Sequence, residues 1–191
     1  AALCRNRSVD LLVVSHNRNH GLERLATTFE RHDETDVEWI KRWARDQGVH
    51  AAVIGLEDPL GVGLPDELSK VGIPTVGPCH NAARLETSKL FMRDLMERHS
   101  IPGQVRYHYF SKASLLRDFM RSSETDFALK PVGLTAGKGV KVMGVQLGSV
   151  DDAIRYGEEV IGRRIGGVSG LVLEERLIGE EFTLQTFVDG E

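Results

Sequence analysis

The stretch from 127 to 145, FALKPVGLTAGKGVKVMGV, decides the fold of the second half of the chain. Two apolar runs, 127–131 and 140–145, are typical of buried strands, and a loop with three glycines joins them. Lys130 lies at the end of the first strand, directly before the loop. Glycine tolerates the backbone angles that turn successive N–H groups toward one centre, so this loop could fold over a polyphosphate. The alternative is a plain hairpin with a solvated lysine, and the loop alone favours neither.

The loop fits neither of two common nucleotide-binding motifs. A Walker loop has four residues between its glycines and leads from a strand into a helix. Here three residues separate Gly133 from Gly137, Lys138 is followed by Gly139, and a strand comes next. The dinucleotide pattern G-x-G-x-x-G is also absent. Any phosphate contact would therefore come from a hairpin loop.

Composition excludes several classes of protein. The 191 residues carry 24 Lys and Arg and 28 Asp and Glu, a formal net charge of -4, which argues against a dedicated nucleic-acid binder. An apolar fraction of 41% excludes a disordered chain, and no apolar run approaches the ~18 residues of a membrane span. Cys4 and Cys79 fit a reducing compartment, so we expect a cytoplasmic protein, with Cys79 buried or partly buried. The seven histidines are scattered and predict no metal site.

In the first part of the chain, short β-branched runs alternate with amphipathic segments. Residues 35–38, TDVE, read as a capping box in which Thr35 is the N-cap of a helix that ends before Gly48. Strands joined by brief helical crossovers form parallel sheets, so an α/β domain with a parallel sheet is expected. The expected buried strands are 9–14, 49–55 and 73–77, with a second helix at 66–71 and a loop with short structure at 15–34.

The second part mixes hairpin-like strands with helices and is expected to be α+β. A junction at 78–87 leads into it. Ser111 and Ser149 are expected to cap two of its helices. The expected helices are 88–99, 111–120 and 149–161, and the expected strands are 105–110, 127–131, 140–145, 171–175 and 181–188.

A wider constellation surrounds the glycine loop. Lys89 begins a helix upstream of it, Glu174 and Glu175 end a strand downstream, and Glu181 follows. Acidic residues that end a strand are usually solvated, but the set as a whole resembles the ATP-grasp superfamily, in which two α+β lobes clamp ATP. The resemblance implies that Lys89 and Lys130 touch the phosphates and that 133–139 is a flexible lid loop. It also implies that 174–177 reads the adenine edge and that Glu181 holds the ribose.

Five segments, in order and spacing, resemble the phosphoribosylamine–glycine ligase family of purine biosynthesis: 72–78, 82–89, 99–102, 130–140 and 174–181. Upstream, 55–60 (GLEDPL) resembles that family's G-P-E-x-P-L loop, which lines the phosphoribosylamine site. Leu56, Pro131 and Thr135 depart from the family's usual residues without removing a charge.

The resemblance implies a reaction and a set of sites. ATP would drive the ligation of glycine to 5-phosphoribosylamine through a glycyl phosphate, with Mg²⁺ or Mn²⁺ as the metal. The implied catalytic residues are Lys89 and Lys130. The implied cofactor-binding residues are Lys89, Lys130, Gly133, Gly137, Lys138, Gly139, Glu174, Glu175, Arg176, Leu177 and Glu181, and the substrate residues are Gly55, Glu57, Pro59 and Leu60.

The resemblance also implies a domain organisation. Residues 1–80 would form the N-terminal substrate domain without its first strand, and 81–191 the first part of an ATP-grasp domain with its lid at about 103–174. The family's N-terminal glycine-rich turn and its metal ligands are missing, so we expect a fragment whose metal ligands lie beyond Glu191 and which binds ATP weakly. The alternatives are another ATP-grasp carboxylate–amine ligase or carboxylase, or a nucleotide-binding module without chemistry.

Overall fold

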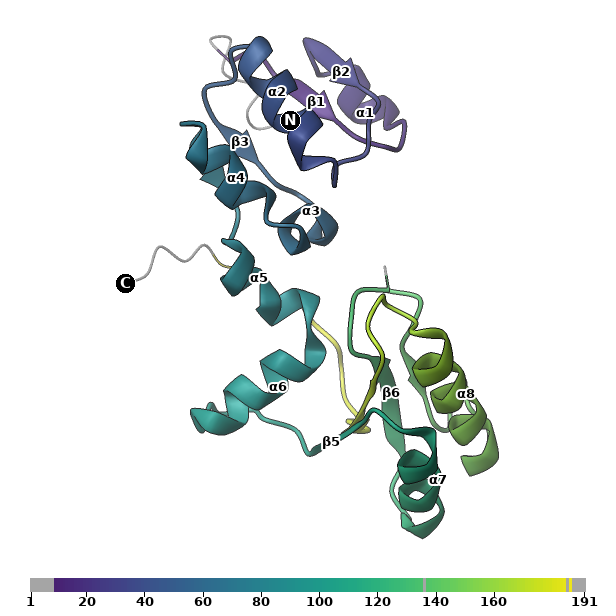
Figure 1. Cartoon of the computed structure of the whole chain (residues 1–191). Coiled ribbons are helices and arrows are strands. Elements are labelled where there is room, and N and C mark those ends of the chain that lie inside the picture. The colour runs from purple at the N-terminus through teal and green to yellow at the C-terminus, as the bar shows by residue number, and fades with distance from the viewer. Residues whose placement is uncertain (1–8, 136, 185, 187–191) are drawn as a thin grey trace. The chain divides into compact units, whose positions relative to one another are not determined.

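The computed structural model describes residues 9–135, 137–184 and 186 (Figure 1). The chain divides into two compact units, with the boundary between Met92 and Arg93. This boundary falls inside one helix, α6 (Lys89–Arg98). None of the described helices is both long and apolar enough to cross a membrane.

The first unit alternates strands and helices, as the sequence predicts. Its strands pair in parallel, Leu12 opposite Thr28 and Ala52 opposite Thr75. The described strands form two separate pairs, β1-β2 and β3-β4, rather than one continuous sheet. The elements are β1 (Leu12–Val14), α1 (His20–Glu23), β2 (Thr28–Glu30), α2 (Val37–Asp46), β3 (Ala52–Val53), α3 (Glu57–Gly61), α4 (Leu64–Lys70), β4 (Thr75–Val76) and α5 (His80–Thr87).

Several expectations for the first unit were wrong. The junction 78–87 contains the helix α5, whereas the short structure expected within 15–34 is present as α1 and β2. The N-cap of α2 is Asp36 rather than Thr35, since the Asp36 carboxylate accepts a hydrogen bond from the Trp39 N–H at 3.1 Å. Val53 is exposed, so its strand is not buried.

The core of the first unit lies between α2 and α4. Ile40 and Ala44 of α2 pack with Leu64 and Leu68 of α4 and with Ile73. These apolar positions recur at helical spacing, so each helix turns one stripe toward the other. Trp39 and Trp43, which pack partly buried against this core, also stack on each other with ring centroids 5.8 Å apart.

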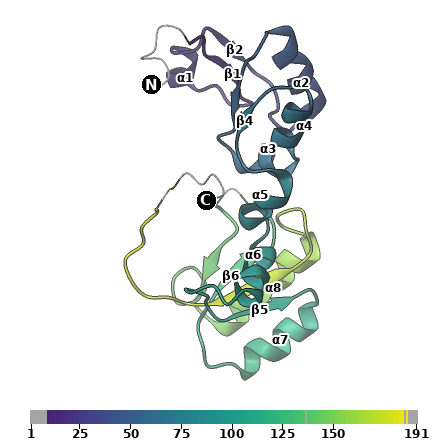
Figure 2. The same cartoon turned by 90° about the vertical axis from the view of Figure 1, so that its left-hand side faces the viewer.

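The second unit is an antiparallel sheet in the order β5-β8-β6-β7 with two helices packed on it. Figure 2 shows α7 and α8 beside the strands. The predicted strands 127–131 and 171–175 are confirmed at both ends, and so is the Ser149 cap, which accepts from the Asp152 N–H. The elements are β5 (Tyr107–Phe110), α7 (Ala113–Ser122), β6 (Phe127–Pro131), β7 (Lys141–Val142), α8 (Val150–Arg163) and β8 (Leu171–Glu175).

Two expectations for the second unit were wrong. Lys112, and not Ser111, precedes α7, and its side chain makes no capping hydrogen bond. The predicted strand 181–188 is absent from those of its residues that the structure describes, 181–184 and 186; the rest of this prediction lies outside the described residues.

Alternation along β6 and β8 gives the sheet two unlike faces. Phe127 and Leu129 of β6, with Leu171 and Leu173 of β8, are buried against α7 and α8. Because successive side chains of a strand point to opposite faces, Lys130 and Glu174 lie on the other face. The packing of the helices therefore determines where these two charges stand.

Candidate functional site

A lysine and a glutamate from neighbouring strands meet on the face of the sheet opposite α7 and α8. In the register of β6 and β8, Lys130 stands opposite Val172 and Glu174 opposite Ala128, which makes the two charged residues diagonal neighbours. The Lys130 Nζ donates to Glu174 Oε2 at 2.6 Å. Glu174 is only 4% exposed, whereas the Lys130 side chain is half-buried.

Arg93, the fifth residue of the ten-residue helix α6, completes this group. Its Nε donates to Glu174 Oε1 and its Nη2 to Glu174 Oε2, both at 2.8 Å, so the guanidinium holds both carboxylate oxygens. Gln104 holds Arg93 with two hydrogen bonds: its Oε1 accepts from Arg93 Nη1 at 3.2 Å, and its Nε2 donates to the Arg93 carbonyl at 2.9 Å. We call Arg93, Glu174 and Lys130 the charged triad. The sequence analysis missed Arg93, although its four-residue spacing from Lys89 on one helix was visible.

The electrostatics of the charged triad favour an ionised Glu174. Burial raises the pKa of a carboxyl group, but hydrogen bonds from Arg93 and Lys130 outweigh this, and the pKa of Glu174 lies below its ordinary value. One carboxylate then faces two cations. The triad carries a net positive charge, and Lys130 is its more exposed cation.

The residues that follow Glu174 are more open. Glu175 accepts from the backbone N–H of Arg106 at 3.0 Å and from its guanidinium Nε at 2.8 Å, on the surface. The Arg176 guanidinium donates to the Met143 carbonyl at 2.9 Å, and its N–H to the Asp126 carbonyl. Leu177 is 71% exposed, and Glu181 is exposed. Along the predicted adenine-reading segment, Glu174 is thus buried, Glu175 and Arg176 are partly buried, and Leu177 is exposed.

The glycine loop between β6 and β7 is shaped by packing as much as by flexibility. A Cβ at Gly133 would stand 2.1 Å from the Gly166 carbonyl oxygen, and one at Gly139 would stand 2.6 Å from the Thr135 side chain. Only Gly137 needs glycine for its backbone, with a φ of +73° and open space around it. Packing thus gives a reason for glycine at positions 133 and 139, and the flexibility of the loop stays a prediction.

Both the turn and the end of the loop are fastened. Within it, Thr135 Oγ1 accepts from the Gly139 N–H at 3.2 Å, and the Thr135 carbonyl accepts from the Lys138 N–H at 3.0 Å. At its end, the buried Tyr156 hydroxyl of α8 donates to the Gly139 carbonyl at 2.5 Å. These two N–H groups are thus already engaged in the loop as it stands. Thr135, a departure from the family's usual residue, closes the turn.

The remaining predicted residues lie in the first unit. Lys89 is the first residue of α6, and Gly55, Glu57, Pro59 and Leu60 lie between the end of β3 and the middle of α3. Pro59 is buried, whereas Gly55 and Glu57 are exposed. Leu60 packs behind the segment after β4, since a Cβ at Gly77 would stand 3.2 Å from its Cδ2. The predicted substrate residues thus follow the carboxyl end of one strand of a parallel pair.

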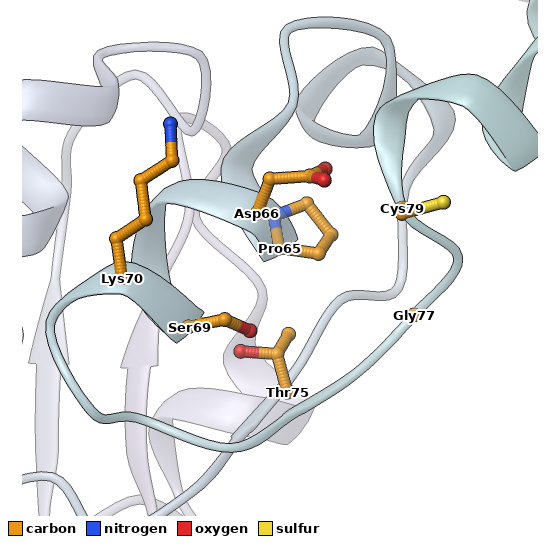
Figure 3. Close-up of a pocket in the computed structure, with 7 residues that line it drawn as sticks. All are labelled: Pro65, Asp66, Ser69, Lys70, Thr75, Gly77 and Cys79. Carbon is orange, nitrogen blue, oxygen red and sulfur yellow. The ribbon is translucent and has the colours of Figure 1, made fainter.

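A shallow pocket of about 420 Å³ lies beside α4, next to this region (Figure 3). Figure 3 shows the hydroxyls of Ser69 and Thr75 facing each other, with the Cys79 thiol pointing away from them. Cys79 is exposed, so the expectation of a buried or partly buried thiol was wrong. None of the predicted substrate residues lines the pocket. Its lining residues are Pro65, Asp66, Ser69, Lys70, Thr75, Gly77 and Cys79.

Metal ligands are not gathered anywhere in the described ranges. Among residues 9–135, 137–184 and 186, no group of three or more His, Cys, Asp or Glu side chains could hold a metal ion. His16 instead pairs with Glu34, their Nδ1 and Oε2 atoms 2.5 Å apart, and His32 with Asp36.

Models of known protein families match both units of the chain. The family model for the N domain of phosphoribosylglycinamide synthetase matches residues 1–86, and the model for the ATP-grasp (A) domain of the same enzyme matches 87–191. The two models meet six residues before the structural boundary between Met92 and Arg93. The boundary that the sequence suggested, between 80 and 81, stays a prediction.

Relatives from methanogens are similar along the whole chain. The phosphoribosylamine–glycine ligase of Methanopyrus kandleri is 44% identical over 192 residues, which cover 100% of this chain and 43% of that protein. The same enzyme from Methanothermobacter thermautotrophicus is 47% identical, covering 93% of this chain and 41% of the relative. The chain thus spans less than half the length of these relatives.

Solved structures show the same fold. Phosphoribosylamine–glycine ligase from Thermotoga maritima superposes with a TM-score of 0.68 at 24% identity, covering 94% of this chain and 40% of the other. The biotin carboxylase domain of Hydrogenobacter thermophilus 2-oxoglutarate carboxylase gives a TM-score of 0.70 at 15% identity, covering 92% and 41%. Since one family model alone covers more than half of the residues, the chain belongs to the phosphoribosylglycinamide synthetase family.

Proposed function

We propose that the chain supplies the ATP-binding and amine-substrate parts of a phosphoribosylamine–glycine ligase. The reaction is the ATP-dependent ligation of glycine to 5-phosphoribosylamine, which gives glycinamide ribonucleotide, ADP and phosphate. The family match supports this, and so do the methanogen relatives, which carry that enzyme's name. The observation that carries the proposal is the charged triad, which holds the partly exposed Lys130 at the base of the glycine loop.

The first chemical step explains the need for lysines. The glycine carboxylate would attack the γ-phosphorus of ATP, forming glycyl phosphate and releasing ADP. Both partners are anions, so positive groups must offset their repulsion. Lys130 is suited to this because the other cation of the triad, Arg93, already occupies both oxygens of Glu174. We assign Lys89 the same role from the first unit.

In the second step the amine of phosphoribosylamine attacks the glycyl carbonyl and displaces phosphate. Acyl phosphates hydrolyse readily, so excluding water is useful, and we assign this task to the glycine loop with Lys138 at its tip. Gly55, Glu57, Pro59 and Leu60 would contact phosphoribosylamine. Their position supports this, because ligands of α/β folds bind beyond the carboxyl ends of parallel strands.

The adenine would be read largely by backbone groups from 174 to 177, and Glu181 would hold the ribose. The Glu174 side chain supports reading by backbone groups, because both of its buried oxygens already accept hydrogen bonds from Arg93 and Lys130. Two neighbouring folds were solved with ADP: the Hydrogenobacter carboxylase domain, which also held magnesium, and an N5-carboxyaminoimidazole ribonucleotide synthetase. The described residues gather no ligands for magnesium, so no step here is assigned to a metal. We place the protein in the cytoplasm with small molecules as its substrates.

The test is an assay of the intact gene product with substitutions at two lysines. Lys130→Ala should raise the apparent KM for ATP or lower kcat by about tenfold or more, because one phosphate contact is lost. The matched control is Lys112→Ala, an exposed lysine before α7, which should leave both constants unchanged. An unchanged profile for Lys130→Ala would remove Lys130 from the ATP site.

The choice of substrate is tested in the same assay. ADP release should require both glycine and phosphoribosylamine, and the product should contain a new amide bond. ADP release that depends on bicarbonate, with glycine inert, would assign the chain to a carboxylase instead.

A further inference from the structure

We infer that Arg93 is a positioning residue: by holding both oxygens of Glu174, it sets the position and the available charge of Lys130. The inference concerns the charged triad itself and rests on the proposed function only where ATP is named. Arg93 lies 37 positions before Lys130 in the sequence. Both side chains are hydrogen-bond donors without an acceptor atom, so the influence of Arg93 passes through the carboxylate of Glu174 that they share.

Arg93 and Lys130 share the oxygens of the Glu174 carboxylate. Glu174 Oε2 accepts from both Lys130 Nζ at 2.6 Å and Arg93 Nη2 at 2.8 Å, whereas Oε1 accepts from Arg93 Nε at 2.8 Å. The planar guanidinium fork matches both oxygens, which a lysine ammonium cannot do. Arg93 therefore fixes the orientation of Glu174, and that orientation decides where Oε2 holds the lysine.

The burial of Glu174 decides how much of the Lys130 charge remains available. A carboxylate that is 4% exposed must be balanced by charge and hydrogen bonds within the protein. If Lys130 were its only cation, the ammonium would be committed to that task. Because Arg93 supplies a full positive charge, Lys130 keeps an uncompensated charge for an incoming anion. The side-chain exposures agree with these roles: the Arg93 side chain is 11% exposed, whereas that of Lys130 is 26% exposed.

Arg93 is itself held in place by neighbouring side chains. Gln104 forms hydrogen bonds with both the guanidinium and the backbone carbonyl of Arg93. The Nη1 atom of Arg93 also approaches the Met96 sulfur. Near by, the Tyr107 hydroxyl of β5 donates to carboxylates of Asp94 and Glu97 on the same helix. This end of α6 is thus joined to the sheet at several points, so Arg93 is a rigid support for Glu174 rather than a mobile surface charge.

The experiment measures Lys130 directly. In the intact gene product, the rate of reductive methylation of the Lys130 amine is followed by peptide mass spectrometry, and the KM for ATP is measured in parallel. The variants are Arg93→Gln, Arg93→Lys and the double variant Arg93→Gln/Glu174→Gln. The control is Arg163→Gln, which removes an arginine from an exposed pair with Glu159 on α8.

Removing Arg93 should commit Lys130 to Glu174. We expect Arg93→Gln to slow labelling of Lys130 by about threefold or more and to raise the KM for ATP by about tenfold. The double variant should restore labelling, because no carboxylate remains to hold the lysine. Arg93→Lys keeps a cation beside Glu174, so its rate of Lys130 labelling should lie between those of Arg93→Gln and the double variant. It serves as the test if Arg93→Gln does not fold. The control should match the wild type.

The outcomes separate this inference from the proposed function. Unchanged labelling in both Arg93 variants, or slow labelling that the double variant does not restore, would overturn the inference. Slower labelling with restoration in the double variant would support it even if the wild type released no ADP, a result that would defeat only the proposed function. A purely structural role would lower stability in Arg93→Gln without the change in Lys130 reactivity.

Discussion

Glu174 and Glu175 are adjacent, chemically identical, and each paired with an arginine, yet they have opposite environments. Glu174 is 4% exposed and shared between Arg93 and Lys130, whereas Glu175 pairs with an Arg106 side chain that is 77% exposed. Alternation along the strand turns them to opposite faces of the sheet. The comparison teaches that face and burial, not residue type or partner, decide which carboxylate belongs to the candidate site.

The two pairs should differ in energy for the same reason. Breaking a buried ion pair leaves an uncompensated charge inside the protein, whereas an exposed pair is screened by water and salt. Substitutions at both glutamates can therefore test this difference.

The largest effect is expected from Glu174→Ala. Removing the carboxylate leaves Arg93 and Lys130 facing each other without an anion, and the free energy of unfolding should fall by about 3 kcal/mol. The measurement is urea denaturation of the intact gene product. Glu175→Ala is the matched variant and should cause a much smaller loss. Equal losses would mean that burial does not distinguish the two carboxylates.

The next effect is a difference in pH dependence. The pKa of Glu174 is lowered in the fold despite its burial, which raises it, because hydrogen bonds from Arg93 and Lys130 prevail. A carboxyl whose pKa is lowered on folding stabilises the protein above its unfolded value and loses that contribution as the pH falls. The stability difference between the wild type and Glu174→Gln should therefore shrink as the pH is lowered below 4.5, the ordinary pKa.

Glu175 gives the companion measurement. The Arg106 N–H, followed by the Arg106 guanidinium, lowers the pKa of Glu175, so the sign is the same. Because this pair is exposed, the difference between the wild type and Glu175→Gln should be small at every pH. A difference for Glu174→Gln that grows in acid would contradict the lowered pKa of that group.

The smallest effect is expected from salt. A double-mutant cycle on Arg106 and Glu175 should give a weak coupling that nearly vanishes at about 1 M salt, where screening acts over a few ångströms. The same cycle on Arg93 and Glu174 should give a larger coupling that changes little with salt. Equal salt sensitivity in thermal unfolding of the two sets of variants would show that water reaches the buried pair.

Local pattern was enough to predict two strands of the sheet in the second unit, whereas the predicted strand 140–145 is reduced to β7 (Lys141–Val142). Strands 127–131 and 171–175 are continuous apolar runs, and burial against two helices preserved both ends as predicted. By contrast, β2 has three residues and is set by its pairing with β1, which no local pattern shows. The predicted strand at 181–188 failed at 181–184, where Phe182 and Leu184 remain exposed.

The candidate site was predictable in part. Lys130 and Glu174 were chosen from their places at strand ends, and diagonal pairing brings them together. Arg93 was missed because its contact with Glu174 spans 81 positions and depends on how α6 docks on the sheet. The packing of Gly133 against the Gly166 backbone and of Gly139 against the Thr135 side chain was not predicted, because such contacts leave no trace in a single sequence.

The meeting of Gly133 and Gly166 also limits which sequences the fold accepts. Each backbone occupies the space that the other's side chain would fill, and Gly166 has a φ of +87° in addition. Replacing one glycine cannot be rescued by trimming its neighbour, since there is nothing left to trim. In a saturation library these two positions should tolerate no substitution, singly or together, although neither belongs to the charged triad.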